Sequence, residues 1–226
     1  MDAVLITGGA SGLGAAVADA VAKDGGRPLI IDRQRPTHEY DWIECDRADT
    51  GAAEDATRQA IELAGNRIDG LVTAAGFDVP GSLAELPREV WERIVTVDLL
   101  ATAAVIRAAL PALKRSHGSI VTVASTLGVK AVGDATAYCA AKFGVVGFTR
   151  SLAAELAGQV NVTLLIPGGM WTRFFDDREE RYKPGPDASL NDPAHTAAAV
   201  VFALSQPPGS SVRELIVANE RETSYP

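Results

Sequence analysis

A tyrosine and a lysine separated by three residues form the most reactive pair in the sequence. Tyr138 and Lys142 belong to the segment Tyr-Cys-Ala-Ala-Lys, and a helix there would place both side chains on one face, one turn apart. A free phenol has a pKa of about 10 and is a poor base at neutral pH. Because a nearby ammonium group favours the phenolate, Tyr138 could exchange a proton with a substrate hydroxyl. The alternative is a Tyr/Lys pair on an ordinary helix, which would do no chemistry.

Ser125 favours the chemical interpretation of that pair. It follows an apolar run, Ser-Ile-Val-Thr-Val-Ala, that is typical of a buried strand. The carboxyl edge of a doubly wound sheet is where such folds bind ligands. A hydroxyl there could hydrogen-bond a carbonyl oxygen on which charge develops. The alternative is a turn serine, with Thr126 and Gly128 after it.

A glycine-rich turn near the N-terminus predicts a binding site for a dinucleotide. Thr7–Gly14 reads Thr-Gly-Gly-Ala-Ser-Gly-Leu-Gly and lies between the first expected strand and the first expected helix. Gly8 permits the tight turn, Gly12 lets the backbone approach a pyrophosphate, and Gly14 allows the helix to pack closely on the strand. Free N–H groups at the helix N-terminus then bind the anion. The predicted contacts of this turn are Gly8, Ser11, Gly12, Leu13 and Gly14.

Asp32 indicates which dinucleotide binds. It ends the second expected strand, 18 residues beyond Gly14, where a carboxylate can accept hydrogen bonds from ribose hydroxyls and would repel a 2′-phosphate. Arg33 and Arg35 follow and could attract a phosphate, but no Lys or Arg lies inside the glycine turn. We therefore expect NAD rather than NADP, bound with the help of Asp32 and Arg33. A solvated turn aspartate is the alternative.

The elements that must position these residues alternate regularly along the chain. Strands separated by helices imply right-handed crossovers and a doubly wound parallel sheet with helices on both faces. We expect one α/β domain over residues 1–226, in which Pro111 bends a helix or marks its boundary and a long irregular stretch, about 168–191, is functional or mobile. The expected strands are 3–7, 28–31, 42–45, 70–74, 119–124, 160–166 and 215–218, and the expected helices are 12–23, 51–63, 87–116, 137–156 and 192–204.

Composition excludes several classes of protein. The chain has 226 residues and a net charge of −8, with no cluster of Lys or Arg that would bind nucleic acid or an anionic membrane. We expect a cytoplasmic protein, because no apolar run comes near a bilayer-spanning length and no basic segment opens a signal peptide. Cys45, Cys139 and the three histidines are scattered, so neither a disulfide nor a metal site is expected.

Taken together, four motifs resemble the short-chain dehydrogenase/reductase family, in its single-domain subclass, along essentially the whole chain. Their joint occurrence in this order is much more specific than any one of them. They are Thr7-Gly8-x-x-x-Gly12-x-Gly14, Thr73-Ala74-Ala75-Gly76, Ser125 placed 13 residues before Tyr138-x-x-x-Lys142, and Pro167-Gly168-x-x-x-Thr172.

The resemblance implies a seven-stranded Rossmann fold and an oxidoreductase that acts on CH–OH groups with a nicotinamide cofactor. It makes Tyr138 the acid/base and Ser125 the residue that orients and polarises the substrate oxygen. Lys142 would bind the nicotinamide ribose and lower the pKa of the tyrosine. The further cofactor contacts that it implies are Asp46 at the adenine, Ala75 and Gly76 along the adenosine, and Pro167, Gly168 and Thr172 at the nicotinamide.

Two departures from the family pattern stand out. The family's Asn-Asn-Ala-Gly segment is Thr73–Gly76 here, which removes side-chain hydrogen bonds that brace the central sheet. The family's helix asparagine, which supports a water-linked proton path to the lysine, corresponds to Asp98. An ionised aspartate can accept but cannot donate a hydrogen bond. We hypothesise that Asp98 keeps this relay working, with Lys142 as its indirect partner.

The loops above the nicotinamide would choose the substrate, and their character favours a fairly apolar or cyclic alcohol. The charged run 176–181 is expected to be a solvated part of that loop, and Cys139 a small buried residue. By resemblance, the helices 87–116 and 137–156 pack into a four-helix bundle of a homodimer or homotetramer, and the tail 214–226 could reach a neighbouring subunit. The candidate wall residues are Phe77, Val79, Leu127, Val129, Trp171, Phe174, Phe175 and Tyr182.

The sequence thus predicts an NAD-dependent alcohol dehydrogenase or ketone reductase. A dinucleotide-sensing binding protein without turnover is the alternative, suggested only by Thr73 and Asp98. An epimerase or dehydratase acting on nucleotide sugars would also use a Tyr-x-x-x-Lys pair. Such enzymes generally carry a larger C-terminal substrate domain, however, and only about fifty residues follow Thr172.

Overall fold

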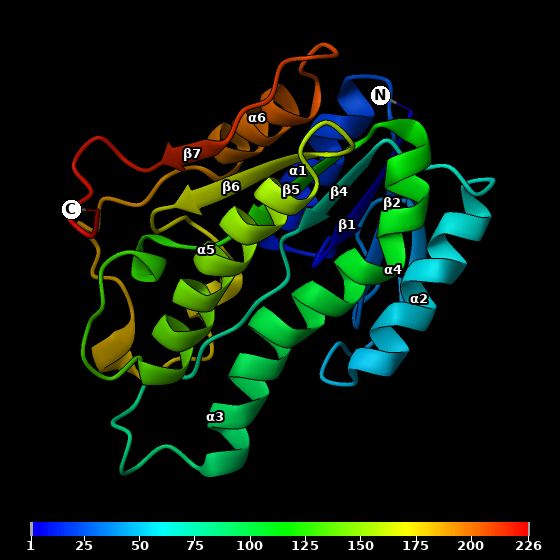
Figure 1. The fold of residues 1–226 in the computed structure, drawn as a ribbon. Helices are drawn as coiled ribbons and strands as arrows, with labels where there is room; N and C mark the ends of the chain where they lie inside the picture. Colours follow the sequence, from blue (N-terminus) through cyan, green and yellow to red (C-terminus); the bar gives the residue numbers. More distant parts are fainter. Residues whose placement is uncertain (1, 226) are drawn as a thin grey trace.

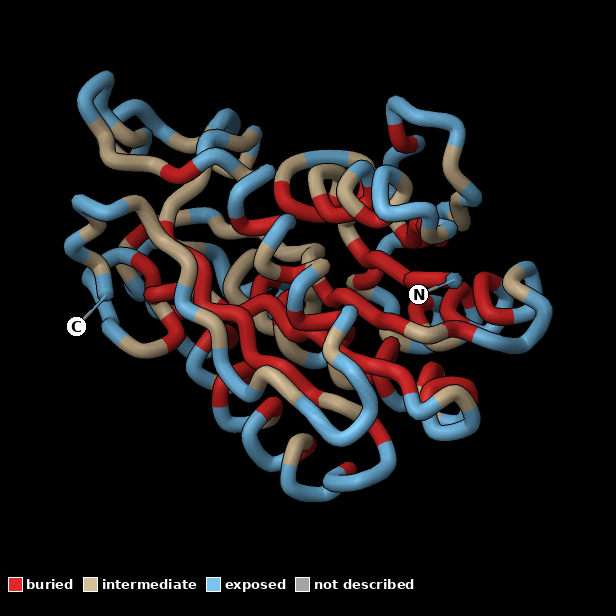
Figure 2. The backbone as a smooth tube through the Cα atoms, turned by 90° about the horizontal axis from the view of Figure 1, so that it is seen from above, coloured by how far each residue is buried: buried red, intermediate tan, exposed pale blue. Residues whose placement is uncertain are grey.

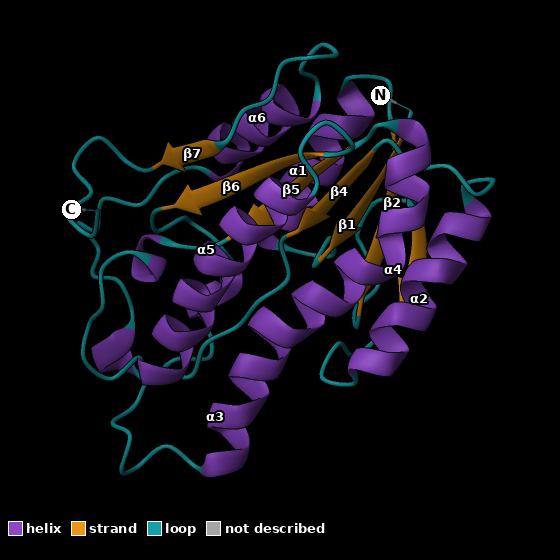
Figure 3. Cartoon of the chain, in the orientation of Figure 1, coloured by secondary structure: helices purple, strands orange, loops and turns teal. Residues whose placement is uncertain are grey.

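Seven parallel strands form one sheet through the middle of the protein (Figures 1 and 3). The computed structural model describes residues 2–225, so Met1 and Pro226, the two ends of the expected domain, lie outside it. The strand order is β3-β2-β1-β4-β5-β6-β7, which confirms the predicted doubly wound sheet. The strands are β1 (Ala3–Thr7), β2 (Arg27–Asp32), β3 (Asp41–Glu44), β4 (Gly70–Thr73), β5 (Ser119–Val123), β6 (Asn161–Pro167) and β7 (Glu214–Val217).

Helices cover both faces of this sheet. On one face, α1 packs beside α6, and on the other α2 and α4 pack together with α5 alongside (Figure 1). The central strands β1, β4 and β5 are buried along their whole length (Figure 2), which explains their continuous apolar runs. The helices are α1 (Gly12–Lys23), α2 (Thr50–Leu63), α3 (Arg88–Val95), α4 (Ala101–Ser116), α5 (Thr136–Glu155) and α6 (Pro193–Leu204).

The order of the strands determines where a ligand can bind. The chain steps outward from β1 to β2 and β3, then returns to the other side of β1 to form β4. Loops that follow β1 and β4 therefore leave in opposite directions and open a crevice at the carboxyl edge. Both the glycine turn after β1 and the segment after β4 lie at this switch point.

The long helix expected over 87–116 is interrupted at a different place from the one predicted. Pro111 lies inside α4, and the boundary is instead a π-helical segment, η1 (Thr96–Leu100), which joins α3 to α4. A π-turn takes in an extra residue and rotates the side chains that follow. Of the two alternatives predicted for Pro111, a bend or a boundary, the boundary was wrong, because the break lies at η1, which contains buried Asp98.

Together these three elements make one helical stretch, Arg88–Ser116, that is long and apolar enough to span a membrane by length and composition. The sequence analysis expected no such run. Half of its most apolar window is buried inside the protein, where α4 packs against α2 and β4. These contacts are those of a core helix of a folded domain, and such a helix can be as long and apolar as a membrane-spanning one.

The turn after β1 depends on two glycines. Gly8 has a φ of +74°, and a Cβ atom on it would lie 2.6 Å from the Cα of Ala75. A Cβ atom on Gly14 would lie 2.1 Å from the carbonyl oxygen of Gly8. The first turn of α1 therefore packs on the end of β1 only without a side chain at Gly14.

We expect Gly14→Ala to lower the free energy of unfolding by about 2 kcal/mol or more, because the backbone carbonyl has no room to move. Denaturant unfolding measures this change. Gly133→Ala is the matched control, since an added Cβ atom there meets nothing within 4 Å. Equal stability of the two variants would contradict the packing role of Gly14.

Candidate active site

Tyr138, Lys142 and Ser125 come together at the carboxyl edge of β5. Tyr138 and Lys142 lie one turn apart at the start of α5, and both are buried. Ser125 follows β5 and begins the short helix η2 (Thr126–Gly128), where its Oγ accepts a hydrogen bond from the N–H of Leu127 at 3.1 Å. The hydroxyl of Ser125 is also close enough to Tyr138 to lower the pKa of the phenol.

Three contacts hold the ammonium group of Lys142. Its Nζ donates a hydrogen bond to the carbonyl oxygen of Val123 at 3.2 Å and lies 3.3 Å from Asp98 Oδ2. It also lies 5.3 Å from the centre of the Tyr138 ring. The ammonium group of Lys142 thus lies close to both the ring of Tyr138 and the carboxylate of Asp98.

Asp98 reaches Lys142 from η1, and its side chain is fully buried. Its Oδ1 accepts a hydrogen bond from the N–H of Phe77 at 3.0 Å. Burial raises the pKa of Asp98, whereas Lys142 lowers it. Lys142 was expected to be an indirect partner of Asp98 through water, but the structure brings the two charges into direct contact, with Asp98 on η1 and Lys142 on α5.

The balance of charges around Tyr138 differs from the expected one. Burial is the largest cause acting on the phenol and raises its pKa, and the carboxylate of Asp98 raises it further. Lys142, which was expected to lower this pKa, is paired with Asp98. A positively charged nicotinamide bound at this edge would favour the phenolate.

The predicted cofactor residues also converge, and they fit a dinucleotide. A Cβ atom on Gly12, which has a φ of +55°, would lie 3.5 Å from the Cβ of Thr172, so the glycine turn faces the segment after β6. Asp32 Oδ2 accepts a hydrogen bond from the N–H of Ala10 at 3.0 Å, and its Oδ1 accepts one from Gln34. The turn after β1 thus combines close backbone approach with a fixed carboxylate, as a nucleotide requires.

The remaining predicted contacts surround this turn. Asp46 accepts hydrogen bonds from Arg93 at 2.7 Å and from the N–H of Ala48, and Arg33 is near enough to lower its pKa. Ser11 caps α1 without a side-chain hydrogen bond. Ala75 packs on Gly8, Gly76 on Asp98, and Gly168 beside Glu222, while Leu13 is buried and Pro167 ends β6.

Arg47 is a structural residue that the sequence analysis missed. It is almost fully buried, and its Nη2 donates hydrogen bonds to the carbonyl oxygens of Ala75 and Val97 at 2.7 and 3.2 Å. It ties the segment after β4 to η1, where the two side-chain amides of the family pattern are missing. Nothing in the sequence around Arg47 separates it from a solvated arginine.

The C-terminal tail packs against loops of the same chain. Glu222 Oε2 accepts a hydrogen bond from the N–H of Gly169 at 3.1 Å, and Ser224 Oγ lies 2.6 Å from Thr126 Oγ1. Lys130 Nζ donates to the carbonyl oxygen of Thr223. Within the chain the tail joins the segment after β6 to η2, and contact with a neighbouring subunit stays a prediction.

The candidate wall residues divide into two groups. Phe77, Leu127 and Phe174 pack with Tyr138 in one apolar cluster, and the rings of Tyr138 and Phe174 are 5.7 Å apart. Phe175 packs edge-on against Phe174 at 5.4 Å. The other four lie elsewhere: Trp171 and Val79 are exposed, Val129 packs in another cluster, and Tyr182 hydrogen-bonds Asp134.

One part of the charged run 176–181 contradicts the sequence interpretation. Arg178 was expected to be solvated, but its side chain is only 14% exposed and its Nη2 lies 2.9 Å from Asp78 Oδ2. The guanidinium lies over the rings of Phe174 and Phe175. Arg178 is therefore largely buried against two aromatic rings and a carboxylate from another loop. The sequence gives no sign of this pairing, because Asp78 lies 100 residues away.

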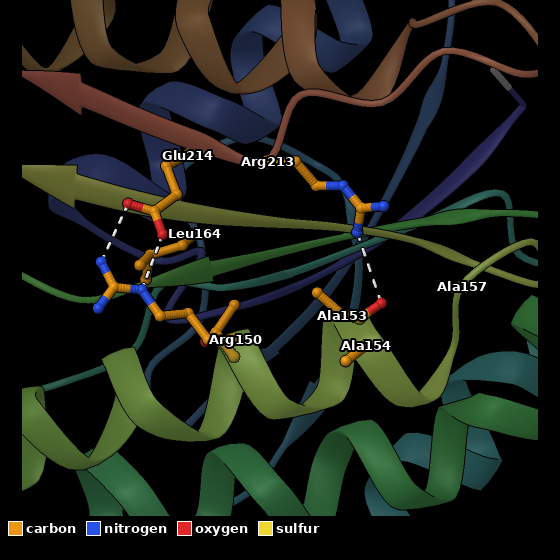
Figure 4. A pocket seen from close by; sticks show the side chains of 8 residues that line it. Arg150, Ala153, Ala154, Ala157, Leu164, Arg213 and Glu214 are labelled. Carbon is orange, nitrogen blue, oxygen red and sulfur yellow. Dashed lines mark hydrogen bonds and ion pairs between the residues drawn. The ribbon is translucent and has the colours of Figure 1, made fainter.

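A hollow between α5 and the β6–β7 edge lies apart from this site (Figure 4). Its most prominent side chains are Arg150 and Glu214, which pair at 2.8 Å across it. It is lined by the second half of α5, whereas Tyr138 and Lys142 belong to the first two turns. The hollow therefore adds nothing to the constellation described above.

Comparisons with known proteins agree with this fold. The family model described as short chain dehydrogenase matches residues 2–183. The chain is 30% identical to a 2-(S)-hydroxypropyl-CoM dehydrogenase of Xanthobacter autotrophicus, over 90% of this chain and 89% of that protein. It is 26% identical to an L-fucose dehydrogenase of Bos taurus, over 98% and 90%. A solved alcohol dehydrogenase of the archaeon Thermococcus sibiricus, complexed with 5-hydroxy-NADP, superposes with a TM-score of 0.85 at 24% identity, covering 98% of each chain.

We expect Asp98→Asn to move the ascending, acidic limb of the pH–rate profile for alcohol oxidation to lower pH, because Tyr138 must lose its proton to act as the base. The substitution keeps an oxygen for the N–H of Phe77 but removes the negative charge that raises the pKa of Tyr138. Alcohol oxidation measured across the pH range tests this, with Glu62→Gln on exposed α2 as control. Identical profiles for wild type and Asp98→Asn would remove Asp98 from the relay.

Proposed function

The chain belongs to the short-chain dehydrogenase family of oxidoreductases, and we propose that it transfers a hydride between NAD and a secondary alcohol or its ketone. The observation that carries the proposal is the meeting of Tyr138, Ser125 and Lys142 at the carboxyl edge of the sheet. The glycine turn that faces Thr172 lies at the same edge. A proton carrier and a nucleotide cradle therefore share one crevice.

Each of the three residues has a separate task in this reaction. The nicotinamide supplies the hydride acceptor when it is bound. Ser125 donates a hydrogen bond to the substrate oxygen and thereby orients it. Tyr138 takes the hydroxyl proton during oxidation and returns it during reduction. Lys142 holds the ribose and shares its positive charge with the phenolate, while Asp98 keeps that ammonium group in place.

Asp32 supports the preference for NAD. Backbone N–H groups of Ala10 and Gln34 hold its carboxylate at the end of β2, beside the glycine turn. Each oxygen retains a lone pair for a ribose hydroxyl, whereas a 2′-phosphate would meet a fixed negative charge. The similar archaeal structure carries an NADP derivative, so the preference of this chain depends on Asp32 itself.

The substrate that we propose has an apolar or cyclic body. Phe77, Leu127 and Phe174 surround the phenol of Tyr138 and offer a flat apolar wall. The similar proteins are named for substrates as different as a sugar and a coenzyme M conjugate, so their names do not select one. We also propose a homodimer or homotetramer, which exposed Leu100 and Phe143 on η1 and α5 support, and a cytoplasmic location.

We expect Tyr138→Phe to lose activity by about 10²–10⁴-fold while it binds NADH normally, because only the proton carrier is removed. Nicotinamide fluorescence measures binding, and NADH oxidation with a panel of ketones measures turnover. Near-normal turnover in this variant would overturn the proposal. Wild-type protein that binds NADH but reduces no ketone would favour a dinucleotide sensor.

We expect Asp32→Ser to raise kcat/KM for NADP by about tenfold or more, because the substitution removes the charge that repels the 2′-phosphate. We expect it also to weaken the binding of NAD, because the carboxylate oxygens that accept hydrogen bonds from the ribose are lost. Parallel assays with both cofactors measure the ratio. Asp41→Ser, at an exposed position on the neighbouring strand β3, is the control. An unchanged NAD/NADP ratio in Asp32→Ser would contradict this role.

A further inference from the structure

Asp78 and Arg178 form a buried ion pair that joins two loops above the phenol. Asp78 follows β4, and Arg178 lies in the segment between β6 and α6, a hundred residues further along. Their Oδ2 and Nη2 atoms are 2.9 Å apart, and the side chains are 4% and 14% exposed. The reaction described above uses neither residue.

The pair lies beside the reacting group. The guanidinium carbon of Arg178 is 4.8 Å from the ring centre of Phe174, and Phe174 packs on Tyr138. The two charges act on the pKa of Tyr138 in opposite directions, Asp78 raising it and Arg178 lowering it. Asp78 and Arg178 are therefore the charged part of the wall whose apolar part is the aromatic cluster.

Each partner keeps one polar atom without a hydrogen bond. Among the described residues, Asp78 Oδ1 and Arg178 Nε are buried atoms for which no partner lies within hydrogen-bond geometry, although Val79 N–H is near enough to lower the pKa of Asp78. Leaving a buried donor or acceptor unsatisfied destabilises the folded protein. The ion pair therefore has one free acceptor and one free donor. A group that both donates and accepts a hydrogen bond would satisfy both atoms.

The charges around the pair select among such groups. A carboxylate would be repelled by Asp78 and by Asp98, which is close enough to raise the pKa of Asp78. An ammonium group would be repelled by Arg178 and has no lone pair for its Nε. A neutral hydroxyl satisfies both atoms, because it donates one hydrogen bond and accepts another.

We propose that Asp78 and Arg178 bind a second hydroxyl group of the substrate, which donates to Asp78 Oδ1 and accepts from Arg178 Nε. This inference rests on the proposed function and narrows it to hydroxylated secondary alcohols and hydroxy ketones whose carbon framework is apolar or cyclic. The aromatic cluster receives the ring, and the ion pair recognises the extra hydroxyl. Sites built to hydrogen-bond a hydroxyl discriminate strongly against an analogue that lacks it.

The test compares cyclohexanol with the 1,2-, 1,3- and 1,4-cyclohexanediols as substrates. We expect wild-type protein to oxidise at least one diol with a kcat/KM at least about tenfold higher than that for cyclohexanol. In Asp78→Leu/Arg178→Met, which replaces the pair by apolar side chains of similar size, the ratio should fall to about one through loss of activity on the diol. A ratio that survives in the double variant would overturn the inference.

A matched control comes from the same loop. Glu179 and Arg181 form an exposed ion pair, 3.0 Å apart, and Glu179→Leu/Arg181→Met should leave the diol preference unchanged. Affinity for NADH and the melting temperature show whether each variant is folded. If the Asp78/Arg178 double variant does not fold, the ratio of kcat/KM for the diol to that for cyclohexanol is measured in Arg178→Lys instead. Lysine keeps the charge but lacks the guanidinium Nε donor, so this ratio should fall there too.

Binding without turnover separates this inference from the proposed function. Calorimetry on the NADH complex of Tyr138→Phe compares cyclohexanone with 2-, 3- and 4-hydroxycyclohexanone. Tighter binding of one hydroxy ketone, lost when the Asp78/Arg178 pair is also replaced, supports the inference even if no alcohol is oxidised. Oxidation of cyclohexanol without any diol preference would overturn the inference and leave the proposed function standing. Equal binding of all the ketones would overturn it as well.

Discussion

The buried contact between Asp98 and Lys142 is the interaction on which the site depends. Both side chains are withdrawn from water, and their charges lie 3.3 Å apart. Leaving either charge alone in that position would cost about 3–5 kcal/mol. The pair therefore locks η1 against α5, and through the N–H of Phe77 and the carbonyl of Val123 it also holds the ends of β4 and β5.

This contact also determines how the phenol of Tyr138 is controlled. A free ammonium group beside the ring would favour the phenolate, but here the ammonium group is paired with Asp98, and burial raises the pKa of Tyr138. A cationic nicotinamide would add the positive charge that the protein alone lacks. In such an arrangement, deprotonation of the tyrosine is coupled to the bound cofactor more closely than to Lys142.

The departures from the family pattern have structural compensations. Thr73 has a buried hydroxyl without a partner in the described chain, so it does not replace the lost side-chain amide. Arg47 enters from the loop after β3 and hydrogen-bonds the backbone of the segment after β4 and of η1. Glu222 fixes the segment after β6 in a comparable way. Two residues outside the motifs, Arg47 and Glu222, thus hold the segments after β4 and β6 in place.

The sequence alone determined the order of the elements, the glycine turn and the reactive Tyr138–Lys142 pair. Periodicity, glycine spacing and an i, i+4 separation are local properties, so they can be recognised without knowledge of the fold. Strand and helix ends were accordingly predicted to within a residue or so, apart from the break at η1.

Only the tertiary structure decided the partners of Asp98, Arg47 and Arg178. Arg47 and Arg178 look like ordinary surface charges in the sequence, and the direct ion pair of Asp98 with Lys142 was not expected; each partner lies many residues away. Whether such a charge is solvated or buried depends on which loops the sheet brings together. Pairing between distant segments has no local signature, because it is selected by the desolvation of both groups in the folded chain.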